Sequence, residues 1–202
     1  MLAKGSLKPI SLSFIPVIIT AILGYHLRHH FIYFTIFFLI LSLIVILFFR
    51  DPNRTTAKGI VSPADGKVML VDKENNRIDI FMNVTDVHVN RSPYSGKVND
   101  TKRIDGEFKP AFSEKSEKNF KHVITLVTDY GTIKIHQITG FLARRIVPYI
   151  KKGDELKKGE RIGLIRFGSR VRLDLPNRVN IIVKKGNKVK ASETTIGVWN
   201  ED

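Results

Sequence analysis

The chain has 202 residues and a formal net charge of +14. Without its very apolar N-terminal stretch, it is long enough for one ordinary domain with a single core. The charge favours nucleic acid, an anionic membrane surface or an acidic ligand as a partner. Because the chain has no cysteine, disulfides, thiolate catalysis and cysteine metal sites are excluded.

Two apolar segments open the chain. Residues 10–25 are nearly all apolar, and residues 31–49 carry no charge. At about 1.5 Å of rise per residue, the second segment spans roughly the 30 Å hydrocarbon core of a bilayer, whereas the first is shorter and contains Pro16. A signal peptide is disfavoured because no small-residue cleavage site follows, and a buried hairpin because nothing downstream could cover it. Residues 1–54 are therefore predicted to form a membrane anchor, a transmembrane helical hairpin.

The flanking basic residues predict the orientation of this anchor. Basic residues precede and follow the apolar pair, and between the two segments only Arg28 stands with three histidines. The positive-inside tendency then places both ends of the hairpin in the cytoplasm. The predicted location is the cytoplasmic membrane, with residues 55–202 on its cytoplasmic face, where a basic surface meets anionic lipid.

Residues 55–202 have the pattern of a compact, mainly β domain. Short runs rich in Val and Ile alternate with Gly, Pro, Asn and Asp turns, and no long amphipathic helix is visible. The predicted strands are 67–71, 77–82, 122–128, 132–138, 161–167 and 179–184. Residues 105–119, which are charged and contain Pro110, are predicted to form an extended loop that could lie over a site.

Two internal repeats refine the fold. Ser-Pro-Ala-Asp-Gly-Lys-Val at 62–68 matches Ser-Pro-Tyr-Ser-Gly-Lys-Val at 92–98, and Lys-Lys-Gly-Asp-Glu-Leu-Lys at 151–157 matches Lys-Lys-Gly-Asn-Lys-Val-Lys at 184–190. Each copy is typical of a turn that leads into a strand. The pairing predicts a pseudo-symmetric β-sandwich or barrel similar to the biotinyl and lipoyl carrier domains, but a fold of this kind does not by itself indicate an activity.

Few residues are candidates for chemistry. With no cysteine, the nucleophiles are hydroxyl groups and lysines. His88 lies beside polar and turn-forming residues, and with Asp65 in a Pro-Ala-Asp-Gly turn it is a candidate base with an orienting carboxylate. His136 is a weaker candidate. Gly168-Ser169 lies between strand-like segments, where a simple bend is the alternative interpretation.

Several motifs, in order along the chain, carry a family resemblance. They are the Pro-Ala-Asp-Gly turn, the His88 segment that ends in Pro93 and Gly96, Gly-Phe-Leu-Ala-Arg-Arg-Ile at 140–146, and Phe-Gly-Ser-Arg-Val at 167–171. Together they resemble the short, single-domain form of phosphatidylserine decarboxylase. The resemblance covers essentially all of residues 55–202, and the apolar N-terminal segments are compatible with it.

The resemblance implies a precursor that cuts itself between Gly168 and Ser169 into chains 1–168 and 169–202. Gly168 lacks a Cβ, so its carbonyl can be approached closely. Ser169 would attack that carbonyl while His88 takes the proton and Asp65 holds the imidazole. Elimination and hydrolysis would then convert Ser169 into an N-terminal pyruvoyl group, and the two chains would stay associated non-covalently.

The implied reaction is decarboxylation of phosphatidylserine to phosphatidylethanolamine and CO2, with no metal. The substrate amine would condense with the pyruvoyl group, which accepts the electrons released when CO2 leaves. His88 is the candidate proton donor. Arg144 and Arg145 are expected to hold the lipid phosphate or to form a solvated strand end. A homodimer is compatible with the sequence.

The sequence departs from the family pattern at two places. Arg172 stands where an Asp is common, and Asn119 is followed by Phe120 and Lys121 instead of Glu and Arg. These changes concern the charge near the cut and the loop 105–119. Two alternatives stay open: the same chemistry on an ether-linked archaetidylserine, and a membrane-tethered lipoyl- or biotinyl-like β-module without catalysis. A nucleic-acid binder is suggested only by the charge, and no nucleic-acid partner is expected, because the basic residues are spread out and two membrane spans argue against it.

Overall fold

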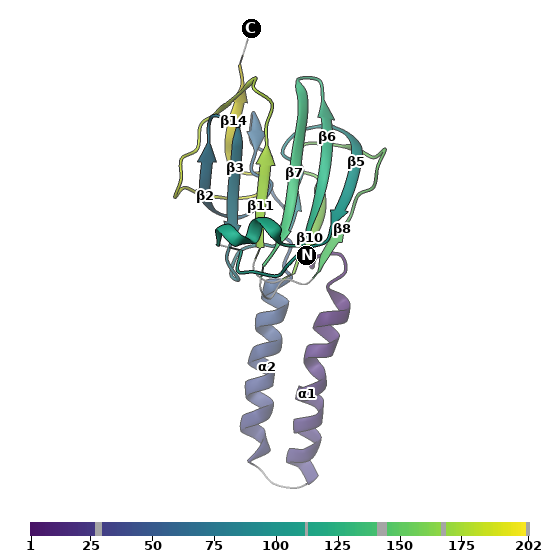
Figure 1. The fold of residues 1–202 in the computed structure, drawn as a ribbon. Coiled ribbons are helices and arrows are strands. Elements are labelled where there is room, and N and C mark those ends of the chain that lie inside the picture. The colour runs from purple at the N-terminus through teal and green to yellow at the C-terminus, as the bar shows by residue number, and fades with distance from the viewer. Residues whose placement is uncertain (27–29, 112, 141–144, 167–168, 201–202) are drawn as a thin grey trace. The chain divides into compact units, whose positions relative to one another are not determined.

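The structure, a computed structural model, describes residues 1–26, 30–111, 113–140, 145–166 and 169–200 (Figure 1). The chain divides into two compact units, Met1–Pro52 and Asn53–Asp202. Arg54, placed with the anchor in the sequence prediction, belongs to the second unit. Its guanidinium group binds Asp65 at 2.7 Å and Glu193 at 3.0 Å.

The first unit is a pair of helices, α1 (Leu7–His26) and α2 (Phe31–Phe48). Both are long and apolar enough to cross a membrane. The few polar side chains on them bond within the pair. Thr35 Oγ1 donates to Thr20 Oγ1 at 3.1 Å, and Ser42 Oγ donates to the Ser13 carbonyl at 2.8 Å. These bonds would satisfy hydroxyl groups that lipid could not satisfy, and the role of the pair as a membrane anchor stays a prediction.

The second unit is built from strands and one short 3-10 helix, η1. In chain order the strands of the described residues are β1 (Ile60–Val61), β2 (Gly66–Asp72), β3 (Arg77–Met82), β4 (Val89–Arg91), β5 (Gly96–Ile104), then η1 (Glu114–Lys118), β6 (Lys121–Thr128), β7 (Gly131–Thr139), β8 (Ile146–Pro148), β9 (Glu155–Leu156), β10 (Arg161–Ile165), β11 (Ser169–Asp174), β12 (Val179–Ile181), β13 (Lys188–Val189) and β14 (Thr195–Trp199). Every segment predicted as a strand overlaps one of these.

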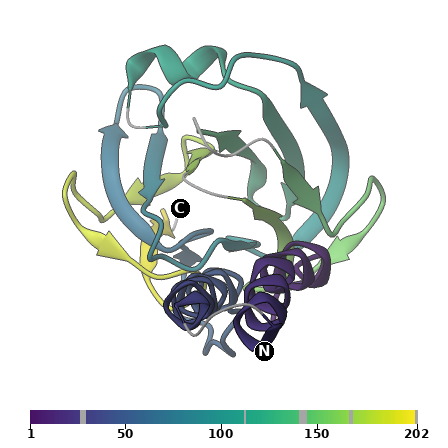
Figure 2. The same cartoon turned by 90° about the horizontal axis from the view of Figure 1, so that it is seen from below.

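Three sheets enclose the core of this unit. The largest has the order β13-β2-β3-β11-β7-β6-β5-β9, and two three-stranded sheets have the orders β1-β14-β12 and β4-β10-β8. The eight-stranded sheet curls into a half-barrel (Figure 2). Its strands alternate in burial, as in β6, where Ile124 and Leu126 are fully buried. This is the period of a sheet with one face on a core, and it confirms the mainly β prediction.

The sequence repeats occupy equivalent positions in this sheet. Gly66 opens β2 and Gly96 opens β5, and each crosses a neighbouring strand closely. A Cβ at Gly66 would lie 2.1 Å from the Phe81 carbonyl oxygen, and one at Gly96 would lie 2.3 Å from that of Val127. No side chain fits at either position, so the matched glycines are required by the same contact.

Each copy of the second repeat pairs with one copy of the first: residues 184–190 lie beside residues 62–68, and residues 151–157 lie beside residues 92–98. The Gly186 amide donates to the Val68 carbonyl at 2.8 Å, and the Gly153 amide donates to the Val98 carbonyl at the same distance. As a result, β13 lies beside β2 and β9 beside β5. The sheet is therefore pseudo-symmetric, with β11 of one half beside β7 of the other at its centre.

Candidate active site

Ser169 is the first residue of β11, the strand between β3 and β7. It is fully buried, and its neighbours across the sheet are Met82 on β3 and Thr139 on β7. Its hydroxyl group donates to Met82 Sδ at 3.3 Å, and a thioether is only a weak acceptor. The candidate nucleophile is thus held in the interior. Gly168, the predicted other side of the cut, lies outside the described residues.

His88 is also fully buried and lies just before β4. Its Nδ1 is 2.9 Å from the Asp86 carbonyl oxygen. Because a carbonyl can only accept, Nδ1 carries the hydrogen, and in the neutral ring Nε2 keeps the lone pair that a general base needs. The His88 carbonyl accepts the Ile165 amide at 3.2 Å, so the His88 segment runs beside the strand that leads toward Gly168.

Asp65 has other partners than His88. One carboxylate oxygen accepts Arg54 Nη2 at 2.7 Å, and the other accepts the Ala191 amide at 2.8 Å. Within the described ranges no hydrogen bond joins Asp65 to His88, so the pairing expected from the sequence is not formed in this structure. The Asp86 carbonyl, which the sequence reasoning missed, orients the ring in its place.

The turn that holds Asp65 has a counterpart in the other half of the sheet. Ser95, at the matching position of the second copy, accepts the Lys158 amide at 3.0 Å, as Asp65 accepts that of Ala191. A serine is sufficient for this backbone contact. The Asp65 carboxylate makes a further contact that the turn does not require, an ion pair with the largely buried Arg54.

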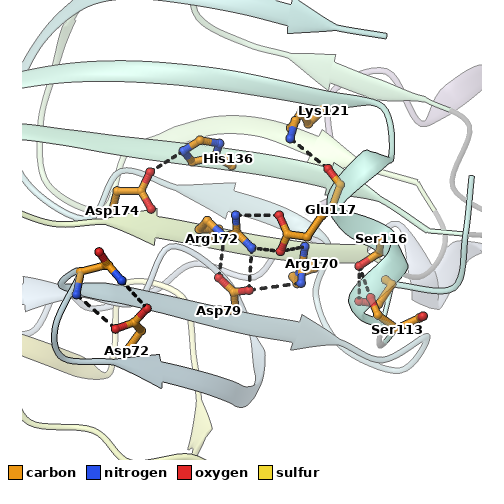
Figure 3. Close-up of polar contacts among 12 residues, drawn as sticks. Asp72, Asp79, Ser113, Ser116, Glu117, Lys121, His136, Arg170, Arg172 and Asp174 are labelled. Atoms are coloured by element: carbon orange, nitrogen blue, oxygen red, sulfur yellow. Dashed lines mark hydrogen bonds and ion pairs between the residues drawn. The ribbon is translucent and has the colours of Figure 1, made fainter. Parts of the chain in front are cut away.

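A cluster of ion pairs follows Ser169 along β11 (Figure 3). Arg170 and Arg172 both bind Asp79 of β3, and both bind Glu117 of η1. Arg170 Nη1 lies 3.2 Å from Asp79 Oδ2, and Arg172 Nη1 donates to Glu117 Oε2 at 2.8 Å. Both arginine side chains are at most 10% exposed. Arg172, the departure from the family pattern, is thus part of a compensated charge cluster.

The charges in this cluster stabilise one another. Partial burial raises the pKa of Glu117, but Arg172 and Arg170 outweigh that effect and lower it to about 2. Burial lowers the pKa of Arg172, while Asp79 and Glu117 raise it further than burial lowers it. Glu117 and Arg172 are therefore ionised at neutral pH, and ion pairs tie the loop that carries Glu117 to β11.

The predicted loop 105–119 is closed by a buried asparagine. The Asn119 side chain accepts the Lys109 amide at 2.8 Å and donates to the carbonyls of Lys109 and Thr139, both at 2.7 Å. Thr139 is the residue of β7 that lies opposite Ser169. The loop is thus fixed beside the start of β11, at the place where a cover over the site would lie.

The structure describes one of the two arginines that were predicted to contact the lipid phosphate. Arg144 lies outside the described residues. Arg145 is exposed, and its carbonyl accepts the Arg166 amide at 3.1 Å. Burial lowers the pKa of Arg166, and the charge of Arg145 lowers it further. Arg145 and Arg166 therefore lie close together, and Arg166 stands two residues before Gly168, at the predicted cut. The sequence reasoning missed Arg166, although its place two residues before Gly168 was a usable signal.

The other histidines of the second unit have structural partners. His136 Nε2 lies 2.8 Å from Asp174 Oδ2. His122 is buried, and its Nδ1 lies 3.0 Å from Gln137 Oε1. His136 is thus engaged with the end of β11 that lies far from Ser169 along the strand.

Comparison with known proteins identifies the family. Residues 41–197 match the family described as Phosphatidylserine decarboxylase. The chain belongs to the phosphatidylserine decarboxylase family. Among relatives of this decarboxylase is a protein from Archaeoglobus fulgidus named "Putative archaetidylserine decarboxylase proenzyme", which is 44% identical over 76% of this chain and 77% of its own.

Two further relatives have comparable similarity to this decarboxylase. A protein of the same name from Methanococcoides burtonii is 43% identical over 97% of this chain and 95% of its own. A "Phosphatidylserine decarboxylase proenzyme" from Streptomyces avermitilis is 46% identical over 75% of this chain and 73% of its own. Among solved structures, the glucose permease IIA from Mycoplasma capricolum matches 68% of this chain and 92% of its own, with 16% identity and a TM-score of 0.41.

Membership of the decarboxylase family selects among the alternatives left open by the sequence. A carrier-like module without catalysis and a nucleic-acid binder are not members of this family. Decarboxylation of a serine phospholipid remains, and the two relative names cover both lipid backbones that the sequence left open.

Proposed function

We propose that the chain is a self-cleaving, pyruvoyl-dependent decarboxylase of phosphatidylserine or of its ether-linked counterpart. The observation that carries the proposal is the position of Ser169, a buried serine at the first residue of a central strand. The His88 carbonyl is bonded to β10, the strand that ends four residues before Ser169, at Ile165. The family match supports the reaction class.

In the proposed self-cleavage, Ser169 Oγ attacks the Gly168 carbonyl carbon and its proton passes to His88 Nε2. The peptide C–N bond breaks as the nitrogen takes up a proton, which leaves an ester. Elimination then releases the carboxyl end of chain 1–168, and water replaces the nitrogen of residue 169 as ammonia. What remains at residue 169 is a pyruvoyl group. Asp65 has the predicted role of an orienting carboxylate, although in the uncut chain the Asp86 carbonyl performs that task.

The residues present fit a pyruvoyl group. Residue 169 lies between β3 and β7 and is fully shielded from water, and the strand that would carry the group is fixed by the Arg170 and Arg172 ion pairs. The pyruvoyl group supplies an electron sink for the pair released when CO2 leaves. The chain's own residues would orient the substrate and exclude water, and His88 is the proposed donor that returns the proton.

Arg145 and Arg166 are proposed to hold the lipid phosphate. Burial lowers the pKa of Arg166 and the charge of Arg145 lowers it further, and a bound anion would relieve the repulsion between the two guanidinium groups. Arginine is well suited to phosphate because its guanidinium group donates in a planar fork. Arg144, beside Arg145 in sequence, is proposed as a further contact.

The helix pair is proposed to anchor the enzyme in the cytoplasmic membrane, with the second unit on the cytoplasmic face. The helices have the length and composition of membrane spans, and the basic residues on both flanks support the orientation. A protease added to sealed, right-side-out cells should leave the second unit intact, and should digest it once the membrane is opened. Digestion in sealed cells would overturn the orientation.

The proposal is tested by intact-mass measurement of the purified full-length protein. Two chains, 1–168 and a 169–202 chain blocked by a pyruvoyl group, are expected. Ser169→Ala should remain uncut, while Ser95→Ala, at an exposed serine, should cut normally. A single uncut wild-type chain would overturn self-cleavage. Release of CO2 from vesicles of phosphatidylserine and of archaetidylserine then distinguishes the two substrates, and no release from either would overturn the reaction.

A further inference from the structure

A row of buried polar side chains leads from His122 on β6 to Ser169. His122 Nδ1 lies 3.0 Å from Gln137 Oε1, and Gln137 Nε2 donates to Asn90 Oδ1 at 2.8 Å. Asn90 Nδ2 in turn donates to Met82 Sδ at 3.6 Å, the same sulfur atom that accepts the Ser169 hydroxyl at 3.3 Å. None of these side chains is more than 3% exposed.

The chemistry of the groups fixes the direction of every bond in this row. An amide oxygen can only accept, so His122 Nδ1 carries the hydrogen. Burial lowers the pKa of His122, which favours the neutral ring. With its Oε1 facing His122, Gln137 presents its NH2 group to Asn90 Oδ1. Asn90 is thereby turned so that its own NH2 group points to Met82 Sδ, the atom that also accepts the Ser169 hydroxyl.

The surrounding backbone leaves room for this arrangement. A Cβ at Gly163, which pairs with Asn90 across β10 and β4, would lie 2.9 Å from Gln137 Nε2 and 3.0 Å from the Val147 carbonyl oxygen. Burying amide and imidazole groups costs free energy unless each of them is hydrogen-bonded. Apolar side chains would fill the same space without that cost, so the stability of the core does not require this row.

We propose that Asn90 is a positioning residue for Ser169 in self-cleavage, with Gln137 and His122 fixing its orientation. The sulfur atom holds the hydroxyl only weakly, so Ser169 Oγ can leave it to attack. The Asn90 NH2 group also points to Met82 Sδ, and it is the donor that holds Ser169 Oγ in place during the attack. The inference rests on the proposed self-cleavage and deepens it.

The test compares cleavage rates of full-length variants, followed by intact mass after synthesis in a cell-free system. Asn90→Asp keeps the size and the acceptor for Gln137 but loses the donor while its carboxylate is ionised. It should cut at least tenfold more slowly than wild type at pH 8. The deficit should shrink as pH falls and the buried carboxyl group regains a hydrogen to donate. If the Asn90 side chain only filled space, the ratio of the wild-type to the Asn90→Asp cleavage rate would not change with pH in this way.

Two further variants keep the test decisive if Asn90→Asp does not fold. Gln137→Glu leaves Asn90 intact but removes the donor that orients it, and it should also slow the cut. Ile124→Val, a buried change on β6 outside the row, is the matched control and should cut at the wild-type rate once its thermal stability is taken into account. Wild-type rates in folded Asn90→Asp or Gln137→Glu would overturn the role of Asn90. Failure of the wild-type chain to cut would instead overturn the proposed function.

Discussion

Arg172 binds Asp79 through two nitrogen atoms of its guanidinium group. The contact is bidentate and uses one edge, since Nε donates to Asp79 Oδ1 at 2.8 Å and Nη2 donates to Asp79 Oδ2 at 3.1 Å. Asp79 is 1% exposed, and it also binds Arg170. A single buried carboxylate on β3 therefore compensates two charges on the strand that begins at Ser169.

Removal of that carboxylate should destabilise the fold strongly. Asp79→Leu is expected to lower the free energy of unfolding by about 3 kcal/mol, because breaking a buried ion pair leaves uncompensated charge. Urea unfolding, with every protein in the uncut Ser169→Ala background, measures the effect. The double change Asp79→Leu and Arg172→Leu should cost less than Asp79→Leu alone. Equal stability of Asp79→Leu and its parent would contradict the cluster's role.

Glu117 should make stability depend on acidic pH. Its pKa is about 2 in the folded chain, below the ordinary value of 4.5. A lowered pKa stabilises the fold above pH 4.5, and this contribution is lost as pH falls from 4.5 toward 2. The difference in melting temperature between wild type and Glu117→Gln should therefore shrink over that range. A difference that stays constant down to pH 2.5 would contradict the assignment.

The glycine at the start of β2 should not tolerate a side chain. In Gly66→Ala the new Cβ would lie 2.1 Å from the Phe81 carbonyl oxygen, so the sheet could not close. We expect no soluble folded protein. Gly153→Ala is the matched control, because its φ of +94° is also left-handed but nothing lies within 4 Å of the new Cβ. It should fold with a loss of about 1–3 kcal/mol from backbone strain. Circular dichroism and yield report both outcomes.

Arg145 and Arg166 should affect substrate binding more than the cut. Arg145→Ala is expected to raise the KM for lipid in vesicles several-fold, because one phosphate contact is lost, and to leave the cleavage rate unchanged. Lys102→Ala, at an exposed residue of β5, controls for the loss of one charge from the basic surface. An equal rise in KM for both variants would assign the effect to general attraction by the membrane.

The strands that the sequence predicted are those with an apolar alternating face, such as β3 and β7. Strands at β5 and β11 were expected only indirectly, from the turn at 92–98 and from the strand-like segments around Gly168-Ser169, because charged residues make them less apolar. In β11, Arg170 and Arg172 are buried rather than exposed, and the partners that compensate Arg172, Asp79 and Glu117, are 93 and 55 residues away respectively. A local pattern contains no information on partners at that distance.

The site was predicted at the level of residues but not of contacts. Ser169 and His88 were selected through motifs, and their catalytic roles stay predictions, whereas the repeats predicted the paired glycine turns that the structure has. The partner of His88 was not predictable, because it is a backbone carbonyl two residues away, and such a contact depends on how the chain turns between them. Asn90 and Gln137 gave no signal, because amide side chains in strands are ordinarily exposed.

The central position of β11 has a consequence for the life of the mature enzyme. A cut before Ser169 would leave β11 between β3 and β7, and β13 beside β2, with each of these neighbours on the other chain. The short chain would be hydrogen-bonded to the long chain along both edges of β11. Before the cut, folding is a reaction of one molecule. Afterwards, recovery from unfolding would require two molecules to meet, so its rate would fall with dilution. The pyruvoyl enzyme would thus be assembled once, from a precursor whose only opportunity to fold alone precedes its own cleavage.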